Sequence, residues 1–160
     1  MSERNALAKE QFITIIPKWL NEEKARFDQV QDSVADLNVA VTVSTMHRVN
    51  VIVNKESLDS VLFITSIGFS PDDQNTFSHL KEDARRKFLR AIKRDLINIG
   101  VAFATPPNEM NVQSIQMSKT VYFDGLTKNS FFETLLTVSR ALMAVQLSYE
   151  TYLSKTRDSV

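Results

Sequence analysis

The sequence predicts an α+β fold, a single domain over residues 1–160, in the order helix, three strands, helix, two strands, helix. Apolar residues recur at helical spacing in three stretches, whereas the segments between these stretches contain apolar residues at every second position. The connections between these segments are short, which favours an antiparallel sheet. Because a helix cannot bury its apolar stripe alone, we expect the helices to pack on that sheet or on one another.

Composition and charge narrow the classes of function. Hydrophobic residues make up 43% of the 160-residue chain and charged residues 24%, which is typical of a folded protein. Nineteen basic residues balance nineteen acidic ones. The chain as a whole therefore has no net charge that would attract nucleic acid or an anionic membrane, and any such binding would need a local patch.

The chain contains no cysteine, which excludes disulfides, thiol nucleophiles and cysteine-ligated metal sites. No apolar run is long enough to cross a membrane, and the first residues, MSERNALAKEQ, lack the apolar core of a signal peptide. We therefore expect a cytoplasmic protein that has no cofactor and no contact with a membrane.

The first predicted helix covers roughly residues 4–27. Pro17 interrupts it, because proline removes one backbone donor. Either the helix kinks or loosens at Pro17, which we favour, or it begins late with Pro17 in its first turn. The residues that recur near helical spacing are Leu7, Phe12, Ile15, Ile16, Trp19, Leu20 and Phe27.

Three predicted strands follow, at residues 37–44, 49–54 and 61–67. In the first of them every second residue is a large apolar one, which is the pattern of a strand with one buried face. Turns are expected at residues 46–48 and 55–59, so the three strands should form an antiparallel meander.

The segment Ser70-Pro71-Asp72-Asp73 predicts the start of the second helix. It combines a capping side chain, a proline at the first helical position and acids near the positive end of the helix dipole. Gly100 can take the left-handed conformation that ends a helix. A break near residues 75–78 would leave a short turn before the main body. The apolar stripe comprises Phe77, Leu80, Ala84, Phe88, Ile92, Leu96 and Ile99.

Two further strands are predicted, a short one at residues 101–104 and a longer one at residues 112–123. Residues 105–108 should form a loop between them, because a Pro-Pro pair cannot continue a ladder. The dipeptide Asp124-Gly125 predicts a turn in which the carboxylate bonds nearby backbone amides and Gly125 takes a positive φ.

The last predicted helix begins near Thr127 or Ser130 and ends before a polar tail that starts at about residue 155. Thr127 can cap this helix, and Ser130 with Glu133 matches a capping box. The main apolar stripe steps by four and three residues through Phe131, Leu135, Val138, Leu142, Val145, Tyr149 and Tyr152.

The order of these elements is similar to that of the type III secretion chaperone-like fold. The segments ARRKFL (residues 84–89) and VYFDGLTK (residues 121–128) resemble an uncharacterised, largely archaeal domain-of-unknown-function family, in which an aromatic-rich strand end, an Asp-Gly-Leu turn and a terminal helix recur. The resemblance implies this fold, with formation of a homodimer and protein binding as expectations at the level of the fold. It implies no activity, and the neutral chain departs from secretion chaperones, which are typically acidic.

No catalytic or metal-binding motif is present in the sequence. Neither His47 nor His79 has HExxH spacing, and there is no GxSxG, P-loop or GxGxxG motif. We interpret His47 as a solvated turn residue and His79 as a local ion-pair partner of Glu82 or Asp83. Asp124 is the best single polar candidate for chemistry, but turn formation explains it better. An enzyme with a dispersed site is therefore the third hypothesis for function.

The second helix carries a basic segment over residues 81–94. Four of its cations fall at adjoining positions on one side, where they form a patch that suits phosphate: Arg86, Arg90, Lys93 and Arg94. A solvated face with local pairs, such as Glu82 with Arg86, is the alternative interpretation. No aromatic residues interleave with these charges, so base stacking is not indicated. Binding of nucleic acid or another polyanion is the second hypothesis.

The last helix carries more apolar surface than a single core contact needs. Phe132, Leu136, Met143 and Leu147 widen its stripe, and a stripe of this width can touch the sheet on one side and a second protein on the other. The first hypothesis is therefore a non-enzymatic module that binds a protein partner or self-associates, with these four residues as its interface. The sequence names no partner and no pathway.

Overall fold

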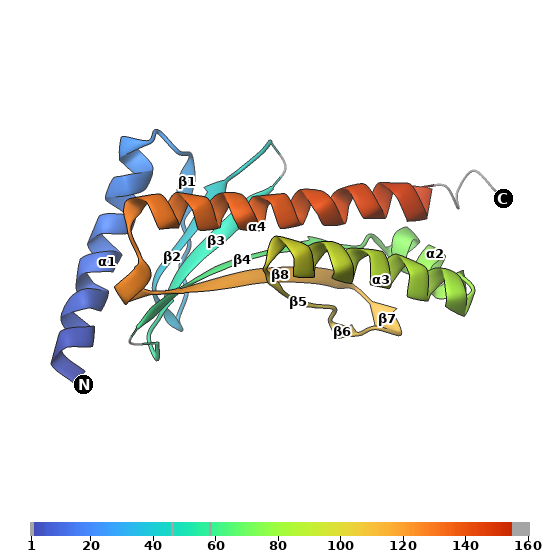
Figure 1. Cartoon of the computed structure of the whole chain (residues 1–160), viewed down its shortest axis with the longest axis horizontal. Helices are drawn as coiled ribbons and strands as arrows, with labels where there is room; N and C mark the ends of the chain where they lie inside the picture. Colours follow the sequence, from blue (N-terminus) through green and yellow to red (C-terminus); the bar gives the residue numbers. More distant parts are fainter. Residues whose placement is uncertain (1, 46, 58, 155–160) are drawn as a thin grey trace. The chain divides into compact units, whose positions relative to one another are not determined.

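The computed structural model describes residues 2–45, 47–57 and 59–154, and it confirms the predicted fold class of helices packed with an antiparallel sheet (Figure 1). The main sheet has six strands in the order β1-β2-β3-β4-β8-β5, and a separate ladder pairs β6 with β7. In chain order the elements are α1 (Ser2–Glu22), β1 (Phe27–Gln29), β2 (Ala35–Thr42), β3 (Arg48–Asn54), β4 (Ser60–Gly68), α2 (Pro71–His79), α3 (Glu82–Ile99), β5 (Ala102–Ala104), β6 (Pro107–Asn108), β7 (Asn111–Val112), β8 (Ser114–Tyr122), the 3-10 turn η1 (Phe123–Gly125), α4 (Lys128–Tyr149) and the π-helical turn η2 (Glu150–Ser154).

The chain divides into two compact units that are interleaved in the sequence. The first unit comprises Met1–Ile64 and Lys119–Leu136, and the second comprises Thr65–Ser118 and Thr137–Val160. The elements β4, β8 and α4 each continue from one unit into the other without interruption. The prediction of a single domain stays a prediction.

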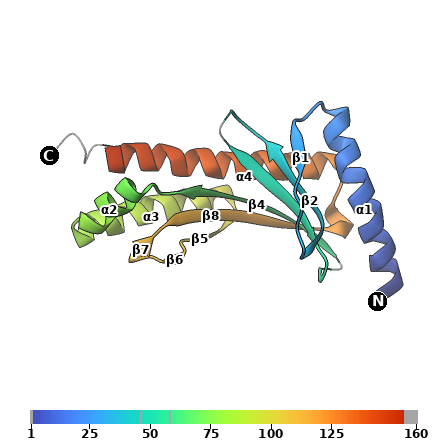
Figure 2. The ribbon, with the colours of Figure 1, turned by 180° about the vertical axis from the view of Figure 1, so that it is seen from behind.

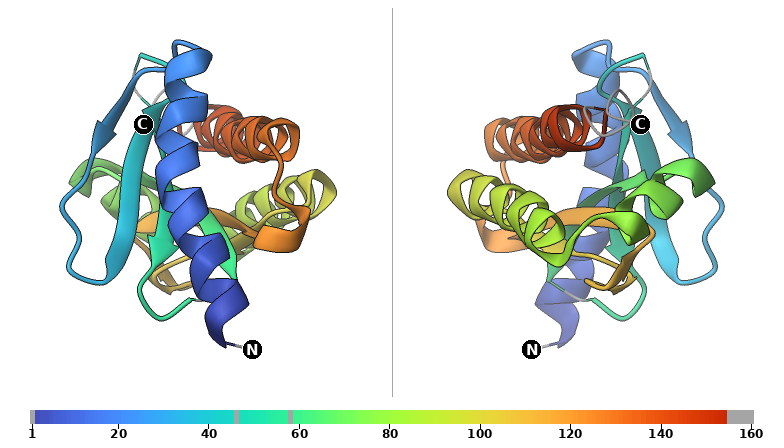
Figure 3. Two further views of the ribbon diagram at one scale, coloured as in Figure 1. Left: turned by 90° about the vertical axis from the view of Figure 1, so that its left-hand side faces the viewer. Right: turned by 90° about the vertical axis from the view of Figure 1, so that its right-hand side faces the viewer.

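The first unit has α1 in front of its strands in the left view of Figure 3, and Figure 2 shows β1, β2 and β3 as neighbouring ribbons. These strands pair antiparallel, with Val41 opposite both Phe27 and Val49. Aromatic side chains close the core, because the Phe131 ring lies 5.7 Å from that of Trp19 and 5.2 Å from that of Phe63. Burial of such large apolar side chains is what holds a helix against a sheet.

The second unit has a core that includes aromatic residues from α2, from α3 and from the loop before α2. The Phe77 ring lies 5.8 Å from that of Phe88, and the Phe69 ring lies 6.2 Å from that of Phe77. The predicted stripe of α3 is buried as expected at Phe88, Ile92 and Leu96. At the edge of the sheet β5 pairs antiparallel with β8.

Helix α1 ends earlier than predicted, at Glu22. Lys24 takes a left-handed φ of 53°, and the amide of Ala25 donates to the carbonyl of Leu20 at 2.9 Å, which turns the chain out of the helix. Phe27, predicted to be the last helical residue, instead opens β1 and pairs with β2. This short strand was missed because it is mostly exposed and carries no alternation.

Pro17 lies inside α1, so the alternative that the helix begins there is wrong. Proline inside a helix costs about 3 kcal/mol. Ile16, Trp19 and Leu20 are all buried around it, and each contributes about 1.5–3 kcal/mol. Packing of the apolar stripe therefore outweighs the missing hydrogen bond.

Strand β2 is buried on both faces, where one buried face was predicted. Asn38 and Ala40, on the face expected to be exposed, are both buried. The Asn38 side-chain amide donates to the Asp32 carboxylate at 2.9 Å, and its oxygen accepts from the Asn50 side chain at 3.0 Å. Burial of this polar side chain is tolerated because its hydrogen-bonding atoms have partners.

The second predicted helix is divided into α2 and α3. Ser70 caps α2 as predicted, since its hydroxyl oxygen accepts from the amide of Asp73 at 3.2 Å, and Gly100 ends α3 with a left-handed φ of 83°. The break lies at Leu80 and Lys81, later than predicted, and both residues have extended backbone angles.

The segment after α3 contains more strands than predicted. Residues 107–108, expected in a loop, form β6 and pair with β7, because a proline keeps its carbonyl and is accepted at the edge of a ladder. The strand predicted over residues 112–123 is interrupted at Gln113, which separates β7 from β8.

Three predictions fall partly or wholly outside the described residues. Met46 and Leu58 belong to the turns expected before and after the second predicted strand, and residues 155–160 belong to the expected polar tail. Arg48, predicted in the first of these turns, begins β3.

Candidate functional site

Helix α4 begins at Lys128, and Thr127 caps it as predicted. The Thr127 hydroxyl accepts from the amide of Ser130 at 3.1 Å, and the Ser130 hydroxyl accepts from the amide of Thr127 at 2.8 Å. This is a capping box with serine at the third helical position. The predicted box of Ser130 with Glu133 is wrong, because α4 already begins at Lys128, which places Ser130 inside the helix rather than at its N-cap.

Lys128 joins the start of α4 to the end of α1 within the first unit. Its ammonium group lies 2.7 Å from a Glu23 carboxylate oxygen and 2.9 Å from one of Glu22. These hydrogen bonds raise the pKa of Lys128, and the same contact lowers the pKa of Glu22. The pairs are exposed, so we expect their main effect to be on the direction in which α4 leaves the turn rather than on stability.

Asp124 and Gly125 lie in the 3-10 turn η1, where the amide of Leu126 donates to the carbonyl of Phe123 at 3.2 Å. The turn is as predicted, but Gly125 does not take a positive φ. Asp124 is exposed and lines a depression of about 210 Å³ with Asp59, Tyr122 and Phe123. Two carboxylates with neither a histidine nor a basic residue among the lining residues indicate no particular chemistry.

The inner side of α4 is buried along its whole length, at Phe131, Leu135, Val138, Leu142 and Val145. This confirms the predicted main stripe over those residues. In the second unit, the Tyr149 ring at the end of the stripe lies 5.1 Å from that of Phe69.

The opposite side of the same helix carries the four residues predicted as an interface, and the structure leaves three of them exposed. Leu136 is 56% exposed, Met143 57% and Leu147 62%, while Phe132 is half-buried with its ring 5.1 Å from that of Phe131. At about 100° per residue, the four side chains fall within an arc of about 60° on one uninterrupted helix. We refer to these four residues as the outer face of α4.

The predicted basic patch lies on α3, and most of its charge is compensated. Arg86 pairs with Glu82 at 2.5 Å, Lys93 pairs with Glu109, and Arg94 lies 3.4 Å from Asp95. The remaining member of the patch, Arg90, is exposed. Three of the four cations therefore have an acidic neighbour, which weakens the attraction that a phosphate backbone would feel.

Each histidine makes only local contacts among those that the structure shows. The His47 ring accepts from or donates to the Ser44 hydroxyl at 3.0 Å, and the His79 ring contacts the carbonyl of Asn75 at 2.8 Å rather than an acid. Within residues 2–45, 47–57 and 59–154 there is no group of three or more His, Asp or Glu side chains that could hold a metal ion.

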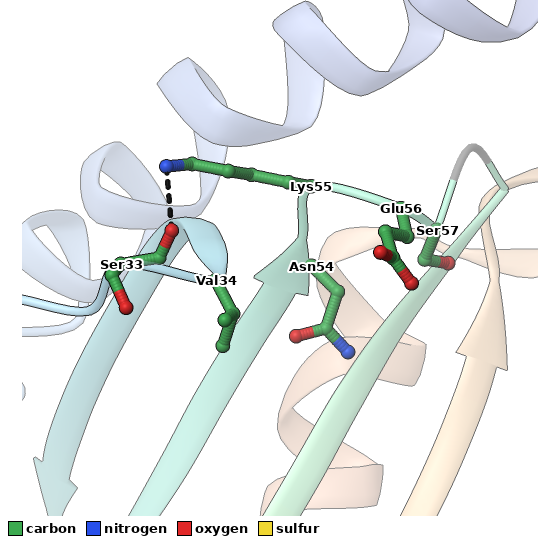
Figure 4. Close-up of a pocket in the computed structure, with 6 residues that line it drawn as sticks. All are labelled: Ser33, Val34, Asn54, Lys55, Glu56 and Ser57. Carbon is green, nitrogen blue, oxygen red and sulfur yellow. Dashed lines mark hydrogen bonds between the residues drawn. The ribbon is translucent and has the colours of Figure 1, made fainter.

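A depression of about 650 Å³ lies beside the end of β3, lined by Ser33, Val34, Asn54, Lys55, Glu56 and Ser57 (Figure 4). The Lys55 ammonium group donates to the carbonyl of Ser33 at 2.7 Å and so closes one side of it. The depression is open to solvent and offers one carboxylate and two hydroxyls, without the convergent ionisable groups of an active site.

Lys9 is the polar residue that the sequence analysis missed. It is 7% exposed, and its ammonium group donates to the backbone carbonyls of Asn54 and Lys55 at 2.7 and 2.8 Å and pairs with Asp36 at 2.6 Å. One side chain thus joins α1 to β2 and to the end of β3. The sequence does indicate that Lys9 lies on the buried side of α1, because its position follows the helical spacing of the apolar stripe that continues at Phe12.

No described helix is both long enough and apolar enough to cross a membrane.

Comparisons with known proteins identify the family. A model of the family described as "Uncharacterized conserved protein (DUF2299)" matches residues 13–148. The crystal structure of an uncharacterized protein from Methanothermobacter thermautotrophicus is similar with a TM-score of 0.76 and 26% identity, over 86% of this chain and 96% of that one. YbjN from E. coli gives a TM-score of 0.49 at 10% identity, over 86% and 90% of the two chains. No curated protein matches significantly. Because the family model spans most of the sequence, the chain belongs to the uncharacterized conserved family DUF2299.

Proposed function

We propose that this protein is a non-enzymatic protein-contact module and that the outer face of α4 is its contact surface. The observation that supports the proposal is the line of Leu136, Met143 and Leu147, each more than half exposed on a single helix. Single exposed apolar residues are normal, whereas contiguous exposed apolar surface marks a site of interaction.

The other helices differ from α4 in this respect. Within the described part of the chain, α1 and α3 each expose one large apolar residue, Leu7 and Ile97, and α2 exposes none. Burial of a whole side chain of this size contributes about 1.5–3 kcal/mol, so covering the exposed half of Leu136, Met143 or Leu147 would contribute roughly 1 kcal/mol for each residue. Burial of the whole face by a partner would therefore favour binding by several kcal/mol, and the free-energy cost of association has to be subtracted from this value.

The two alternative functions have less support. Polyanion binding through α3 would rely on cations of which three are already paired with acids. An enzyme would need converging ionisable groups, and the depressions described above do not supply them. Absence of activity stays a proposal, as does a cytoplasmic location, which the cysteine-free composition favours. The similarity to type III secretion chaperones and the archaeal character of the family also stay predictions.

The double substitution Leu136→Glu/Met143→Glu tests the contact surface, because glutamate is a good helix former and desolvating its charge opposes contact. Ile97→Glu is the matched control, an equally exposed apolar residue on α3. Two quantities are compared among the variants: the sedimentation coefficient of the purified chain over a concentration series, and the recovery of each protein captured from an extract of the native cells. The proposal expects the double variant to lose a self-association or a captured protein that the control retains. If both variants match the wild type in both measurements, the outer face of α4 is not a contact surface.

A further inference from the structure

We infer that a depression beside the end of α1 and the first three strands binds the phosphate group of a small phosphorylated molecule between Arg26 and Arg48. The depression has a volume of about 680 Å³, and small-molecule sites occupy about 300–1,000 Å³. It is lined by residues of α1, β1, β2, β3 and the connections between them, all within the first unit. The inference goes beyond the proposed function, because α4 contributes nothing to this lining.

The sheet places the two arginines on either side of Thr42. The amide of Thr42 donates to the carbonyl of Arg26 at 2.8 Å, and Thr42 is the cross-strand partner of Arg48. The three residues therefore form one row across neighbouring strands (Figure 2), and all three line the depression. Neighbouring strands lie about 4.8 Å apart, so the Cα atoms of the two arginines are separated by roughly 10 Å. Two long side chains can reach one ligand across that distance.

The depression contains donors that the fold itself does not use. Arg48 pairs with Asp28 at 2.8 Å, whereas no acidic side chain among the described residues pairs with Arg26. In the same described part of the chain, the side chains of Thr42 and Thr45 have no hydrogen-bond partner. Two guanidinium groups and one carboxylate leave the lining with a net positive charge, which favours an anion.

These donors suit a phosphate monoester better than other common anions. Near neutral pH a phosphate monoester carries a charge of about −1.5 to −2 and presents three acceptor oxygens. Two arginines can share these oxygens, because each guanidinium group presents a planar fork of N–H donors. A carboxylate has one charge and two oxygens, which a single arginine satisfies, and each phosphate of a nucleic-acid backbone also carries one charge.

The size of the depression indicates that the phosphate is part of a larger molecule. A water molecule occupies about 30 Å³ in the liquid, and a phosphate group replaces only a few of them. Most of the 680 Å³ is therefore left for the organic part of the ligand. The threonine hydroxyls and the side chain of Asn21 line this remaining space, so a polar organic part fits it better than an apolar one.

Asp28 competes with the ligand for Arg48. The Arg48 side chain is 55% exposed and that of Asp28 65%, and an ion pair of this exposure is weak. A phosphate can therefore replace the carboxylate, although the two negative charges repel each other. The arrangement predicts effects of opposite sign, because removing the Asp28 charge should strengthen binding and removing either arginine should weaken it.

Isothermal titration calorimetry at low ionic strength tests the site. The probes are inorganic phosphate and ribose 5-phosphate, with ribose as the probe that lacks the phosphate. The variants are Arg26→Gln, Arg26→Gln/Arg48→Gln and Asp28→Asn, and Arg90→Gln on α3 is the matched control, an exposed arginine outside the depression. Circular dichroism checks that each variant is folded. Arg26→Gln decides alone if the double variant unfolds, because the described structure gives Arg26 no ion pair to lose.

The wild type and Arg90→Gln should bind ribose 5-phosphate with equal affinity, and neither should bind ribose. Arg26→Gln should weaken binding by about fivefold or more through loss of charge-assisted hydrogen bonds, and the double variant should not bind. Asp28→Asn should tighten binding about threefold, which is the effect expected of an exposed ion pair.

Three results would overturn the inference. The first is a wild type that binds neither phosphate probe up to about 10 mM. The second is binding that the arginine variants retain, or that Arg90→Gln loses equally, because the attraction would then not arise in this depression. The third is sedimentation of the protein with vesicles that contain phosphatidic acid, but not with phosphatidylcholine alone, when neither soluble probe binds. That result would assign the phosphate to a lipid head group rather than to a small molecule.

Discussion

Replacing Lys9 by methionine should destabilise the protein more than any other lysine-to-methionine change on α1. The Lys9 ammonium group lies among three acceptors, the carbonyls of Asn54 and Lys55 and the carboxylate of Asp36, at 2.6–2.8 Å. Methionine retains most of the aliphatic stem and its packing but donates no hydrogen bond. The substitution therefore isolates the polar contribution of this side chain.

The magnitude follows from the number and burial of the acceptors. A hydrogen bond to a charged group contributes about 1.5–3 kcal/mol, and a buried acceptor left without its partner costs about 1–3 kcal/mol. The Asp36 side chain is 34% exposed, so water can replace part of what the carboxylate loses. Removing the ammonium group also removes the cost of burying it. The net loss in the free energy of unfolding should be about 2–3 kcal/mol, which corresponds to a decrease in Tm of roughly 4–12 °C for a chain of this size.

The assay is urea denaturation followed by circular dichroism, with a thermal melt beside it. Lys18→Met is the matched control on the same helix, because the Lys18 side chain is 71% exposed and lies 4.0 Å from Glu22. The control should stay within about 0.5 kcal/mol of the wild type. If Lys9→Met is no less stable than Lys18→Met, then the buried ammonium group does not hold α1 to the end of β3, and the reasoning is refuted.

Four further outcomes are expected. Gly100→Ala should lower stability by about 1–2 kcal/mol, because its φ of 83° is unfavourable for a residue with a Cβ, although no atom obstructs that Cβ; an unchanged urea midpoint would contradict this. Ser130→Ala should lower Tm by about 2–4 °C through loss of the capping box, and an unchanged melt would show that the cap is redundant. Asp32→Asn should lower the urea midpoint near neutral pH, because hydrogen bonds from a backbone amide and from an asparagine side chain lower the pKa of Asp32 below its ordinary 3.8. The pKa of Asp32 is lower in the folded state than in the unfolded state, so the stabilisation of the fold by the charged Asp32 carboxylate is present above pH 3.8 and disappears as the pH falls through the lowered pKa. A difference in urea midpoint between Asp32→Asn and the wild type that is equal near pH 2 and pH 7 would rule this out. A labelled oligonucleotide should bind neither the wild type nor Arg86→Glu/Arg90→Glu at low salt, and binding that only the wild type shows would establish the polyanion alternative.

Local features of the fold were predictable where the residues that determine them lie close together in the sequence. Ser70 caps α2, Gly100 ends α3 in the left-handed conformation, and Thr127 caps α4, as expected from the residue types. The buried stripes of α3 and α4 follow the helical spacing of their apolar residues. In each case the deciding interactions lie within a few residues along the chain.

Features that depend on a distant segment were missed. The strand that begins at Phe27 forms because β2 offers it an edge, and Asn38 is buried because Asp32 and Asn50 supply its partners. Lys9 is buried because carbonyls more than forty residues away accept from it. None of these partners can be read from the spacing around the residue itself.

The sequence by itself determined that α4 is a long helix with apolar residues on more than half of its circumference, because helical periodicity is a property of spacing alone. Only the tertiary structure decided which of them are covered. It buries the line through Phe131 and Leu142 against the rest of the chain and leaves Leu136, Met143 and Leu147 exposed. The physical reason is that a helix can bury one side against its own fold, and the side that stays uncovered depends on where distant segments pack.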